Sequence, residues 1–344
     1  MSTEAVSSES KTQCPLPLTR SSVLAAHRAI DGQIHRTPVL TSSSLAASLP
    51  GKNTLYFKAE NLQRGGAFKF RGASYSLACL TPDELAKGVC THSSGNHAGA
   101  LALAAKQRGV PCYVVMPSNS AQPKIDAVRA YGASITFCAP TARARAAALA
   151  TVRAQTGAAF VPPYDAANTI LGQGTAMLEL LAQAPEPLAA VVAPVGGGGL
   201  LAGTALAAEG TGVRVFGAEP AGADDCARGL EEGRRREDVD ARTIADGLRT
   251  PVGVLNFGVI RESVEGVITV SDEEIIEAMR LLWERMKVVV EPSGAASFAA
   301  VRSGQFQALG IEGPVGVILS GGNVDLSKPL PWVQAQVHAN PGSS

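Results

Sequence analysis

The sequence is poor in the features that mark several common protein classes. Only 17% of its 344 residues are charged, and its 30 basic and 30 acidic residues cancel. A chain without net charge offers no electrostatic surface for nucleic acid. The run of three arginines at 234–236 has acidic neighbours on both sides, which is typical of a solvated loop. We therefore expect a small-molecule partner and no nucleic acid.

Secretory and membrane signals are also missing. The first twenty residues contain no apolar segment, and no apolar run elsewhere approaches the length of a membrane span. No C-x-x-C pair occurs among the six cysteines Cys14, Cys79, Cys90, Cys112, Cys138 and Cys226. Scattered cysteines favour buried free thiols in a reducing compartment. We expect a cytoplasmic protein without a membrane partner.

What the sequence does contain is an alternation of two patterns. Short β-branched apolar runs alternate with longer Ala- and Leu-rich stretches of helical period. This alternation is typical of an α/β fold, in which helices cover both faces of a parallel sheet. The runs predicted as strands buried on both faces are Thr54–Lys58, Cys112–Met116, Ile135–Cys138, Ala189–Val195, Arg214–Ala218 and Val315–Leu319.

The clearest helix is expected to begin at Ser271. Ser271 and Glu274 have the spacing of a capping box, and apolar residues then recur every three or four positions. Trp283 lies on that apolar stripe and is predicted to be core. Three segments are predicted to run from strand through a loop of small residues to a helix: Val89–Lys106, Val191–Ala208 and Ile318–Asp325. Loops of this kind bind ligands in parallel sheets.

The first candidate site is the loop Gly196-Gly197-Gly198-Gly199-Leu200, between a predicted strand and a predicted helix. Four glycines let several backbone N–H groups face one point, and the helix adds its positive end, so the loop can hold a phosphate. The loop matches neither the P-loop nor the dinucleotide fingerprint, which disfavours a nucleoside triphosphate or NAD. A tight turn without a ligand is the alternative.

The second candidate is Lys69, which lies between Phe68 and Phe70. Apolar neighbours lower the pKa of an ammonium group, and a lysine that forms a Schiff base requires this. By spacing alone, a lysine that extends along an amphipathic surface is favoured instead.

The third candidate is Ser93-Ser94-Gly95-Asn96-His97, after the run GVCTH. Hydroxyls and N–H groups at a helix N-terminus could hold a carboxylate while one hydroxyl faces the reacting carbon. A plain N-cap is an equally good interpretation. A Ser-His-Asp hydrolase is excluded because the chain has no G-x-S-x-G elbow.

Two more loops contain polar groups. Ser320, which follows the run VGVIL, could place a hydroxyl against a ring nitrogen. Glu219 and Asp225 supply two hard oxygens a short loop apart, which suit Mg²⁺, Mn²⁺ or Ca²⁺. Two acids in a loop are ordinarily just solvated.

The order of the motifs is more specific than any one of them. Between about Leu24 and Trp332 the chain contains, in order, AFKFRG, SSGNHA, GQGT, VGGGGLLAG, IADG, ERMKVVVEPSGA and LSGGNVD. This series resembles the fold type II pyridoxal-phosphate enzymes, and within them the group of serine racemases and serine, threonine or 3-hydroxyaspartate ammonia-lyases.

The resemblance implies the architecture and the cofactors. It implies a tryptophan synthase β-like α/β fold with two open, twisted, mostly parallel sheets flanked by helices. Residues 1–80 and 162–344 would form a large domain that binds pyridoxal phosphate, and residues 81–161 a small one. The chain would form a homodimer. A divalent cation, Mg²⁺ or else Mn²⁺ or Ca²⁺, would be bound by Glu219, the carbonyl of Ala223, and Asp225.

The resemblance also assigns site residues by position. Lys69 would carry the cofactor, Phe68 would lie beside its ring, and Asn96 would bond to the ring hydroxyl oxygen. Ser320 would meet the pyridine nitrogen. The remaining predicted cofactor contacts are Gly196, Gly197, Gly198, Gly199, Leu200 and Gly247, and the predicted substrate contacts are Ser93, Ser94, Gly95, Asn96 and His97.

The implied reaction begins when Lys69 removes the Cα proton of L-serine, L-threonine or 3-hydroxyaspartate. Loss of hydroxide from Cβ then leads to a keto acid and ammonia, whereas a proton returned by Ser94 to the other face gives the D-amino acid. Ammonia-lyase activity is placed slightly ahead of racemisation. The alternatives are a predominant serine racemase, a non-catalytic protein that binds pyridoxal phosphate, and an NAD-dependent dehydrogenase.

Two positions depart from the animal racemases. Tyr164 stands where they have asparagine, and Gly99 replaces a glutamine near their nucleotide effector site. The second change does not favour activation by ATP. The preferred substrate is left open.

Overall fold

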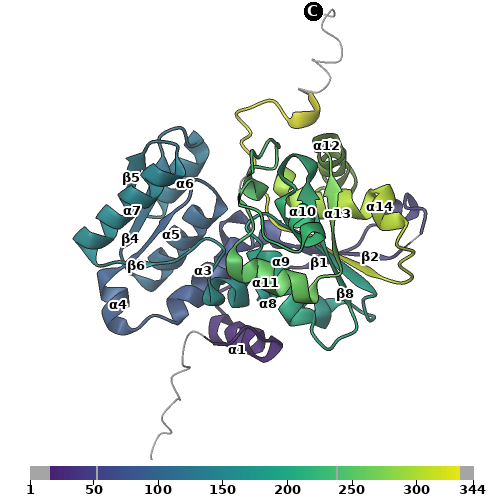
Figure 1. Ribbon diagram of the computed structural model, residues 1–344, viewed down its shortest axis with the longest axis horizontal. Helices are drawn as coiled ribbons and strands as arrows, with labels where there is room; N and C mark the ends of the chain where they lie inside the picture. Colours follow the sequence, from purple (N-terminus) through teal and green to yellow (C-terminus); the bar gives the residue numbers. More distant parts are fainter. Residues whose placement is uncertain (1–15, 52, 238, 334–344) are drawn as a thin grey trace, which may run out of the picture.

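Two open sheets organise the molecule (Figure 1). The computed structural model describes residues 16–51, 53–237 and 239–333. Within them, one sheet has the strand order β1-β2-β10-β7-β8-β9 and the other has the order β5-β4-β3-β6. Neighbouring strands are parallel except for β1 and β2. The strands are β1 (Val39–Leu40), β2 (Leu55–Ala59), β3 (Val89–His92), β4 (Cys112–Pro117), β5 (Ser134–Cys138), β6 (Ala159–Phe160), β7 (Ala190–Pro194), β8 (Arg214–Pro220), β9 (Gly266–Val270) and β10 (Val315–Leu319).

Helices connect and cover these strands. The α-helices are α1 (Arg20–Ile30), α2 (Ser43–Ala47), α3 (Lys69–Ala78), α4 (Pro82–Lys87), α5 (Asn96–Arg108), α6 (Gln122–Ala130), α7 (Ala142–Thr156), α8 (Ala167–Gln183), α9 (Gly199–Ala208), α10 (Asp225–Glu232), α11 (Val254–Ser263), α12 (Asp272–Leu281), α13 (Pro292–Arg302) and α14 (Gly304–Gln307). Short 3-10 turns are η1 (Glu60–Leu62), η2 (Arg64–Gly66), η3 (Ala221–Ala223) and η4 (Asp246–Leu248), and η5 (Leu282–Met286) is a π turn. No helix in the described ranges is long and apolar enough to cross a membrane.

The six-stranded sheet is buried on both faces, as its apolar strands predict. In β7, Val191 and Ala193 belong to the core cluster that includes α3, α8 and α9, whereas Ala190 and Val192 belong to the cluster that includes α12 and α13. Successive side chains of a strand point to opposite faces, so a continuously apolar strand needs cover on both sides. The expected α/β fold with two mostly parallel sheets is confirmed.

The four-stranded sheet is formed by residues between Val89 and Phe160. One of its faces packs on α7, where Cys90 and Val115 form a small core with Leu149 and Val152. Figure 1 shows this sheet and its helices beside the six-stranded one. The proposed domain boundaries at residues 81 and 161 stay a prediction.

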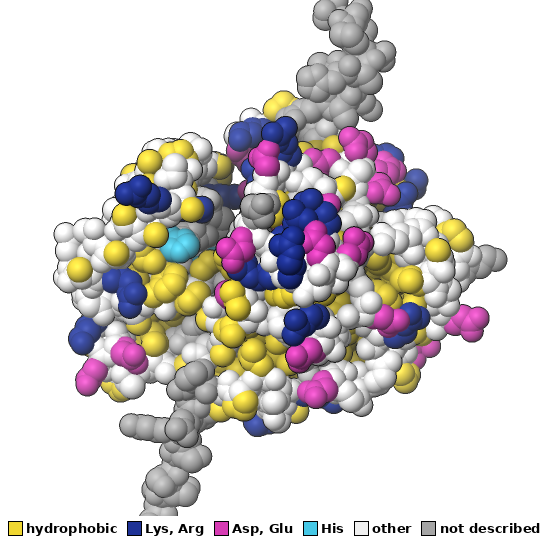
Figure 2. Space-filling model, in the orientation of Figure 1, with side chains coloured by type: hydrophobic (Ala, Val, Ile, Leu, Met, Phe, Trp, Pro, Cys, Tyr) yellow, Lys and Arg dark blue, Asp and Glu magenta, His cyan; other side chains and the backbone are white. Residues whose placement is uncertain are grey.

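Several local expectations are confirmed at the level of side chains. Ser271 Oγ accepts a hydrogen bond from the Glu274 N–H at 3.2 Å, and a Glu274 carboxylate oxygen accepts one from the Ser271 N–H at 2.8 Å, which completes the capping box. Trp283 packs against the core around α12 and α13, and its ring N–H donates to the Val290 carbonyl at 3.0 Å. Acidic and basic side chains are interspersed on the face shown in Figure 2.

Other expectations are wrong. The segment Ile135–Cys138 was expected to be a strand buried on both faces, but Phe137 is 46% exposed. The segment belongs to β5, an edge strand, which has fewer neighbours to cover its side chains. The segment Ile318–Asp325 enters no helix after β10, because its loop instead bonds to the chain before α3. The expectation of free thiols fails at Cys79, a half-buried residue at the end of α3, which is disulfide-bonded. Cys90, Cys112, Cys138 and Cys226 are free, and Cys14 lies outside the described residues.

Glycines let three helices cross backbone to backbone beneath the six-stranded sheet. A Cβ atom on Gly172 of α8 would lie 2.6 Å from the Cα of Gly72 in α3. A Cβ atom on Gly203 of α9 would lie 2.5 Å from the Ile170 carbonyl oxygen and 2.6 Å from the Gly174 nitrogen, both in α8. Because backbone atoms cannot give way, larger residues here would push the helices apart.

We expect Gly203→Ala to lower the free energy of unfolding by about 2 kcal/mol or more, because it forces α8 and α9 apart. The matched control is Gly258→Ala in α11, where a Cβ would meet nothing within 4 Å. This control should stabilise the protein by about 0.5–1 kcal/mol through helix propensity. Urea unfolding of both variants measures the difference, and equal stabilities would contradict the backbone contact.

Candidate active site

The segment before Lys69 is bonded to the loop that follows β10. The Phe68 N–H donates to the Ser320 carbonyl at 3.0 Å, and the Gly322 N–H donates to the Gly66 carbonyl at 2.9 Å. Asn323 then reaches the start of α5, where its side-chain amide donates to Asn96 Oδ1 at 2.9 Å. Three of the segments singled out in the sequence therefore lie in direct contact.

Lys69 is the first residue of α3, and its side chain is half-buried. Lys69 Nζ donates to the Pro163 carbonyl at 2.7 Å and lies 5.0 Å from the centroid of the Phe68 ring. Burial disfavours the charged ammonium and lowers the pKa of Lys69 to about 8. A minority of this amine is therefore neutral, and nucleophilic, near physiological pH, but far more of it than of an ordinary lysine.

The glycine loop presents buried amides with nothing to bond. Gly196 and Gly198 are buried, Gly198 has φ +91°, and α9 begins at Gly199. Among the described residues, no acceptor lies within hydrogen-bond reach of the N–H groups from Gly196 to Leu200. Unpaired buried amides are rare, so several together at a helix N-terminus fit an anion such as a phosphate.

The same loop cannot contain larger residues. A Cβ on Gly196 would lie 2.7 Å from the Leu248 Cα, and one on Gly197 would lie 2.4 Å from Cγ of Tyr164. Gly247, in η4 beside Leu248, donates its N–H to Ser293 Oγ at 3.0 Å, and Ser320 Oγ donates to the Ser293 carbonyl at 3.3 Å. The predicted cofactor contacts Gly247 and Ser320 are thus joined through Ser293.

The loop after β3 leads directly into α5. The Gly95 N–H donates to Ser93 Oγ at 3.2 Å, whereas the N–H groups of Ser94, Asn96 and His97 have no acceptor among the described residues. The half-buried Ser94 hydroxyl forms no hydrogen bond with them either. These donors at a helix N-terminus can bind a carboxylate.

The His97 side chain points away from those donors. Its Nε2 lies 3.1 Å from the Val161 carbonyl oxygen, and burial, with a smaller effect of Lys69, lowers the pKa of His97 to about 3. The imidazole is therefore neutral at physiological pH. Any contact of His97 with a substrate carboxylate is left to its main-chain N–H.

Glu291 is a site residue to which the sequence assigned no role. Its Oε1 accepts a hydrogen bond from the Asn96 side-chain amide at 2.5 Å, across 195 residues of sequence. Burial, with a contribution from Asp246, raises the pKa of Glu291 to about 7. Asn96 and Glu291 line a cleft of about 730 Å³, together with Gly65, Lys124, Asp246 and Asn323. A buried acid beside Asn96 has no local sequence signature that could have predicted it.

Arg145 of α7 is a second residue that sequence analysis did not single out. Its charge acts on the pKa values of His92 and Tyr164, and its buried Nε has no partner among the described residues.

The predicted metal ligands lie near one another at the end of β8. Glu219 is buried, and its two oxygens accept the N–H groups of Cys226 at 3.0 Å and Ala227 at 2.8 Å. Asp225 is also buried and accepts the Val252 N–H at 2.8 Å. Burial raises the pKa of each acid, and the charge of Asp225 adds to the rise at Glu219.

The Ala223 carbonyl accepts no hydrogen bond from the described residues, so it is available as a third oxygen. Within the described ranges, no cluster of three His, Cys, Asp or Glu side chains could hold a metal. A cation here would therefore need this main-chain carbonyl. Two buried carboxylates and a free carbonyl are the donors that a hard divalent cation prefers.

A desolvated lysine, a glycine loop that fits a phosphate and an open parallel sheet define the class of fold type II pyridoxal-phosphate enzymes. The chain belongs to the family described as pyridoxal-phosphate dependent enzymes, whose model matches residues 30–321.

Individual relatives extend over most of the chain. It is 47% identical to a serine racemase of Dictyostelium discoideum, over 90% of this chain and 96% of that one. It is 45% identical to a beta-hydroxyaspartate dehydratase of Paracoccus denitrificans, over 91% and 98% of the two chains. The structure of maize serine racemase superimposes with a TM-score of 0.88 at 42% identity, covering 94% of this chain and 98% of that one.

The lowered pKa of Lys69 predicts how the apoprotein captures its cofactor. The neutral amine attacks the aldehyde, so the capture rate should rise about tenfold per pH unit up to pH 8 and then level off. An unshifted lysine would continue to accelerate to about pH 10. Stopped-flow absorbance of apoprotein mixed with pyridoxal phosphate measures the profile, and a rise that continues past pH 9 would show that the amine is not desolvated.

Proposed function

We propose that this enzyme acts on L-serine, L-threonine or 3-hydroxyaspartate, as an ammonia-lyase that removes the β-hydroxyl group, as a racemase, or as both. The observation that carries the proposal is the desolvated Lys69 amine, which directly follows a segment bonded to the Ser320 loop, and that loop is in turn bonded to the start of α5. Relatives named serine racemase and beta-hydroxyaspartate dehydratase are almost equally similar to the chain, at 47% and 45% identity, which supports both outcomes.

The residues present fit the cofactor. Lys69 would hold it covalently, the amides from Gly196 to Leu200 would bind its phosphate, and Phe68 and Gly247 would lie beside its ring. Asn96 would donate to the ring hydroxyl oxygen, and Ser320 would meet the pyridine nitrogen. Glu291 orients Asn96, because the Glu291 carboxylate accepts a hydrogen bond from the Asn96 side-chain N–H while Asn323 donates one to Asn96 Oδ1.

Bound pyridoxal phosphate supplies an electron sink for the negative charge that develops on Cα. The substrate amine would replace Lys69 on the cofactor, and the freed, neutral Lys69 amine would then take the Cα proton as general base. The N–H groups at the start of α5 hold the substrate carboxylate, with Ser93 and Gly95 shaping that loop. The Ser94 hydroxyl lies on the opposite face of the substrate and donates a proton there.

Two outcomes then compete for the same deprotonated substrate. If the β-hydroxyl group leaves, the product hydrolyses to a keto acid and ammonia. If Ser94 delivers its proton first, the product is the D-amino acid. A predominant serine racemase that makes D-serine is the second candidate, and the unbonded Ser94 hydroxyl favours it.

The remaining proposals concern the setting of this site. Glu219, the Ala223 carbonyl and Asp225 bind Mg²⁺, or Mn²⁺ or Ca²⁺, and the pair of buried acids supports this assignment. Residues 81–161 form a small domain on a large one, two copies of the chain form a dimer, and the enzyme works in the cytoplasm.

Removal of the Ser94 hydroxyl separates the two outcomes. Ser94→Ala should reduce D-serine formation from L-serine by about a hundredfold or more, because it removes the acid on one face, while keto-acid release falls far less. The assay scores both products from L-serine, L-threonine and L-threo-3-hydroxyaspartate. Ser134→Ala is the control, since Ser134 is an exposed serine of the edge strand β5, outside the site.

Neither product from any of the three substrates, with cofactor bound, would refute the proposed function. An equal loss of both products in Ser94→Ala would refute the role of Ser94 alone.

The proposed metal site predicts that a bound cation raises the thermal stability of the protein. At saturation Mg²⁺ should raise the melting temperature by about 5 °C, because it neutralises two buried carboxylates in the folded state alone. EDTA should reverse the rise. In Glu219→Gln the response should vanish, whereas Glu262→Gln, an exposed acid on α11, should respond like the wild type. A rise that persists in Glu219→Gln would place the cation elsewhere.

A further inference from the structure

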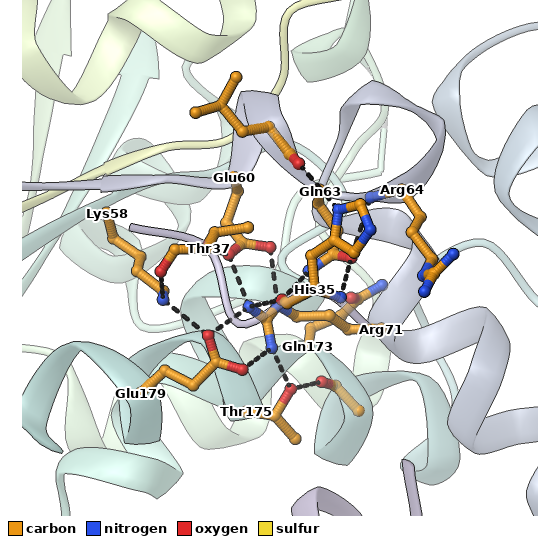
Figure 3. A network of polar contacts seen from close by, with 12 residues as sticks. His35, Thr37, Lys58, Glu60, Gln63, Arg64, Arg71, Gln173, Thr175 and Glu179 are labelled. Atoms are coloured by element: carbon orange, nitrogen blue, oxygen red, sulfur yellow. Dashed lines mark hydrogen bonds and ion pairs between the residues drawn. The ribbon is translucent and has the colours of Figure 1, made fainter. Parts of the chain in front are cut away.

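Arg71 lies at the centre of a buried network of charges two residues after Lys69 (Figure 3). Its guanidinium donates to both oxygens of Glu60, at 2.6 and 2.7 Å, and to both oxygens of Glu179, at 2.7 and 2.8 Å. Lys58 donates to Glu179 at 2.6 Å and to the Thr37 carbonyl at 2.7 Å. The side chains of Arg71 and Lys58 are 0% exposed, and their charges are balanced by those of Glu60 and Glu179.

The network joins three elements that surround the cofactor lysine. Arg71 is in the first turn of α3, Glu60 lies directly after β2, and Glu179 is in α8. A planar guanidinium with two bidentate carboxylates admits one geometry, so it fixes where the first turn of α3 lies relative to α8. Figure 3 shows both carboxylates meeting the guanidinium from different sides.

The acceptor of the lysine amine is tied to the same helix. Lys69 Nζ donates to the Pro163 carbonyl, and Thr169 in the first turn of α8 donates to the neighbouring Pro162 carbonyl at 3.0 Å. Helix α8 is therefore bonded through Arg71 to the turn that contains Lys69. Through Thr169 it is also bonded to the segment that contains the Pro163 carbonyl, which accepts from the lysine amine. A shift of α3 against α8 would change the distance between the amine and its acceptor.

We propose that Arg71 is a positioning residue for Lys69: its fork on Glu60 and Glu179 sets where the cofactor lysine lies against α8 and keeps its amine out of water. This proposal rests on the proposed function, in which Lys69 holds the cofactor and takes the Cα proton. Lysine at position 71 would keep the charge but lose the fork.

The surroundings of the amine make its position measurable. The groups that face Lys69 are the Phe68 ring of its own segment, the Pro163 carbonyl before α8, and the neutral His97 of α5. No carboxylate of the described residues contributes to its lowered pKa, which comes from burial. If the first turn of α3 moves, water reaches the amine and its pKa rises toward the ordinary value for lysine, about 10.4.

The test compares three apoproteins by the pH profile of cofactor capture: wild type, Arg71→Lys and Phe306→Leu. Phe306 is buried in α14, in the other core cluster, so its variant loses stability without touching α3 or α8. The capture midpoint is the pH at which the rate of cofactor capture reaches half of its plateau. We expect it to stay near pH 8 in wild type and Phe306→Leu and to rise by about one unit or more in Arg71→Lys. After loading, kcat of Arg71→Lys should fall by about a hundredfold with little change in KM.

An Arg71→Lys protein that melts earlier but keeps the wild-type midpoint and kcat would overturn the proposal, because Arg71 would then be only structural. If Arg71→Lys does not fold, Thr175→Val is measured instead. That variant removes the hydroxyl that accepts from the same guanidinium at 3.2 Å, and its midpoint should shift in the same direction. A wild-type protein that captures no cofactor would instead refute the proposed function itself.

Discussion

The removal of one amine from water is the constraint on which the rest of the site depends. An ammonium group loses hydration when it is buried, so its neutral form is favoured and its pKa falls to about 8 at Lys69. Burial alone does not fix where the Lys69 side chain lies. The carbonyl of Pro163 and the ring of Phe68 limit those positions, and the charges around Arg71 hold the helix on which the lysine lies.

The architecture brings distant loops to this amine because parallel strands end at a common edge. Strands β7 and β10 are neighbours in one sheet, and the glycine loop and the Ser320 loop follow them directly. The second sheet contributes the loop after β3, which joins the first sheet through Asn96 and its bonds to Glu291 and Asn323. The amides of the glycine loop, the Lys69 amine and the Ser94 hydroxyl are thus supplied by separate segments of the chain.

Local sequence patterns predict what local physics determines. Continuous apolar runs gave β4, β7 and β10 to within two residues, and the capping box gave the start of α12, because burial and capping act over a few residues. The two-residue strands β1 and β6 were not predicted, since they depend on neighbouring strands, and neither was the five-residue edge strand β9. The bond between Asn96 and Glu291, and the network around Arg71, join residues far apart in sequence, so no period or spacing reports them.

The most direct measurement of the central claim is chemical labelling of the cofactor lysine. Apoprotein is incubated with pyridoxal phosphate, treated with borohydride to make the covalent link permanent, and digested for peptide mass analysis. The structure predicts that the cofactor mass is found on the peptide that contains Lys69 and that Lys69→Ala protein acquires none. Labelling of a different lysine, or of none in protein that has turned yellow, would contradict it.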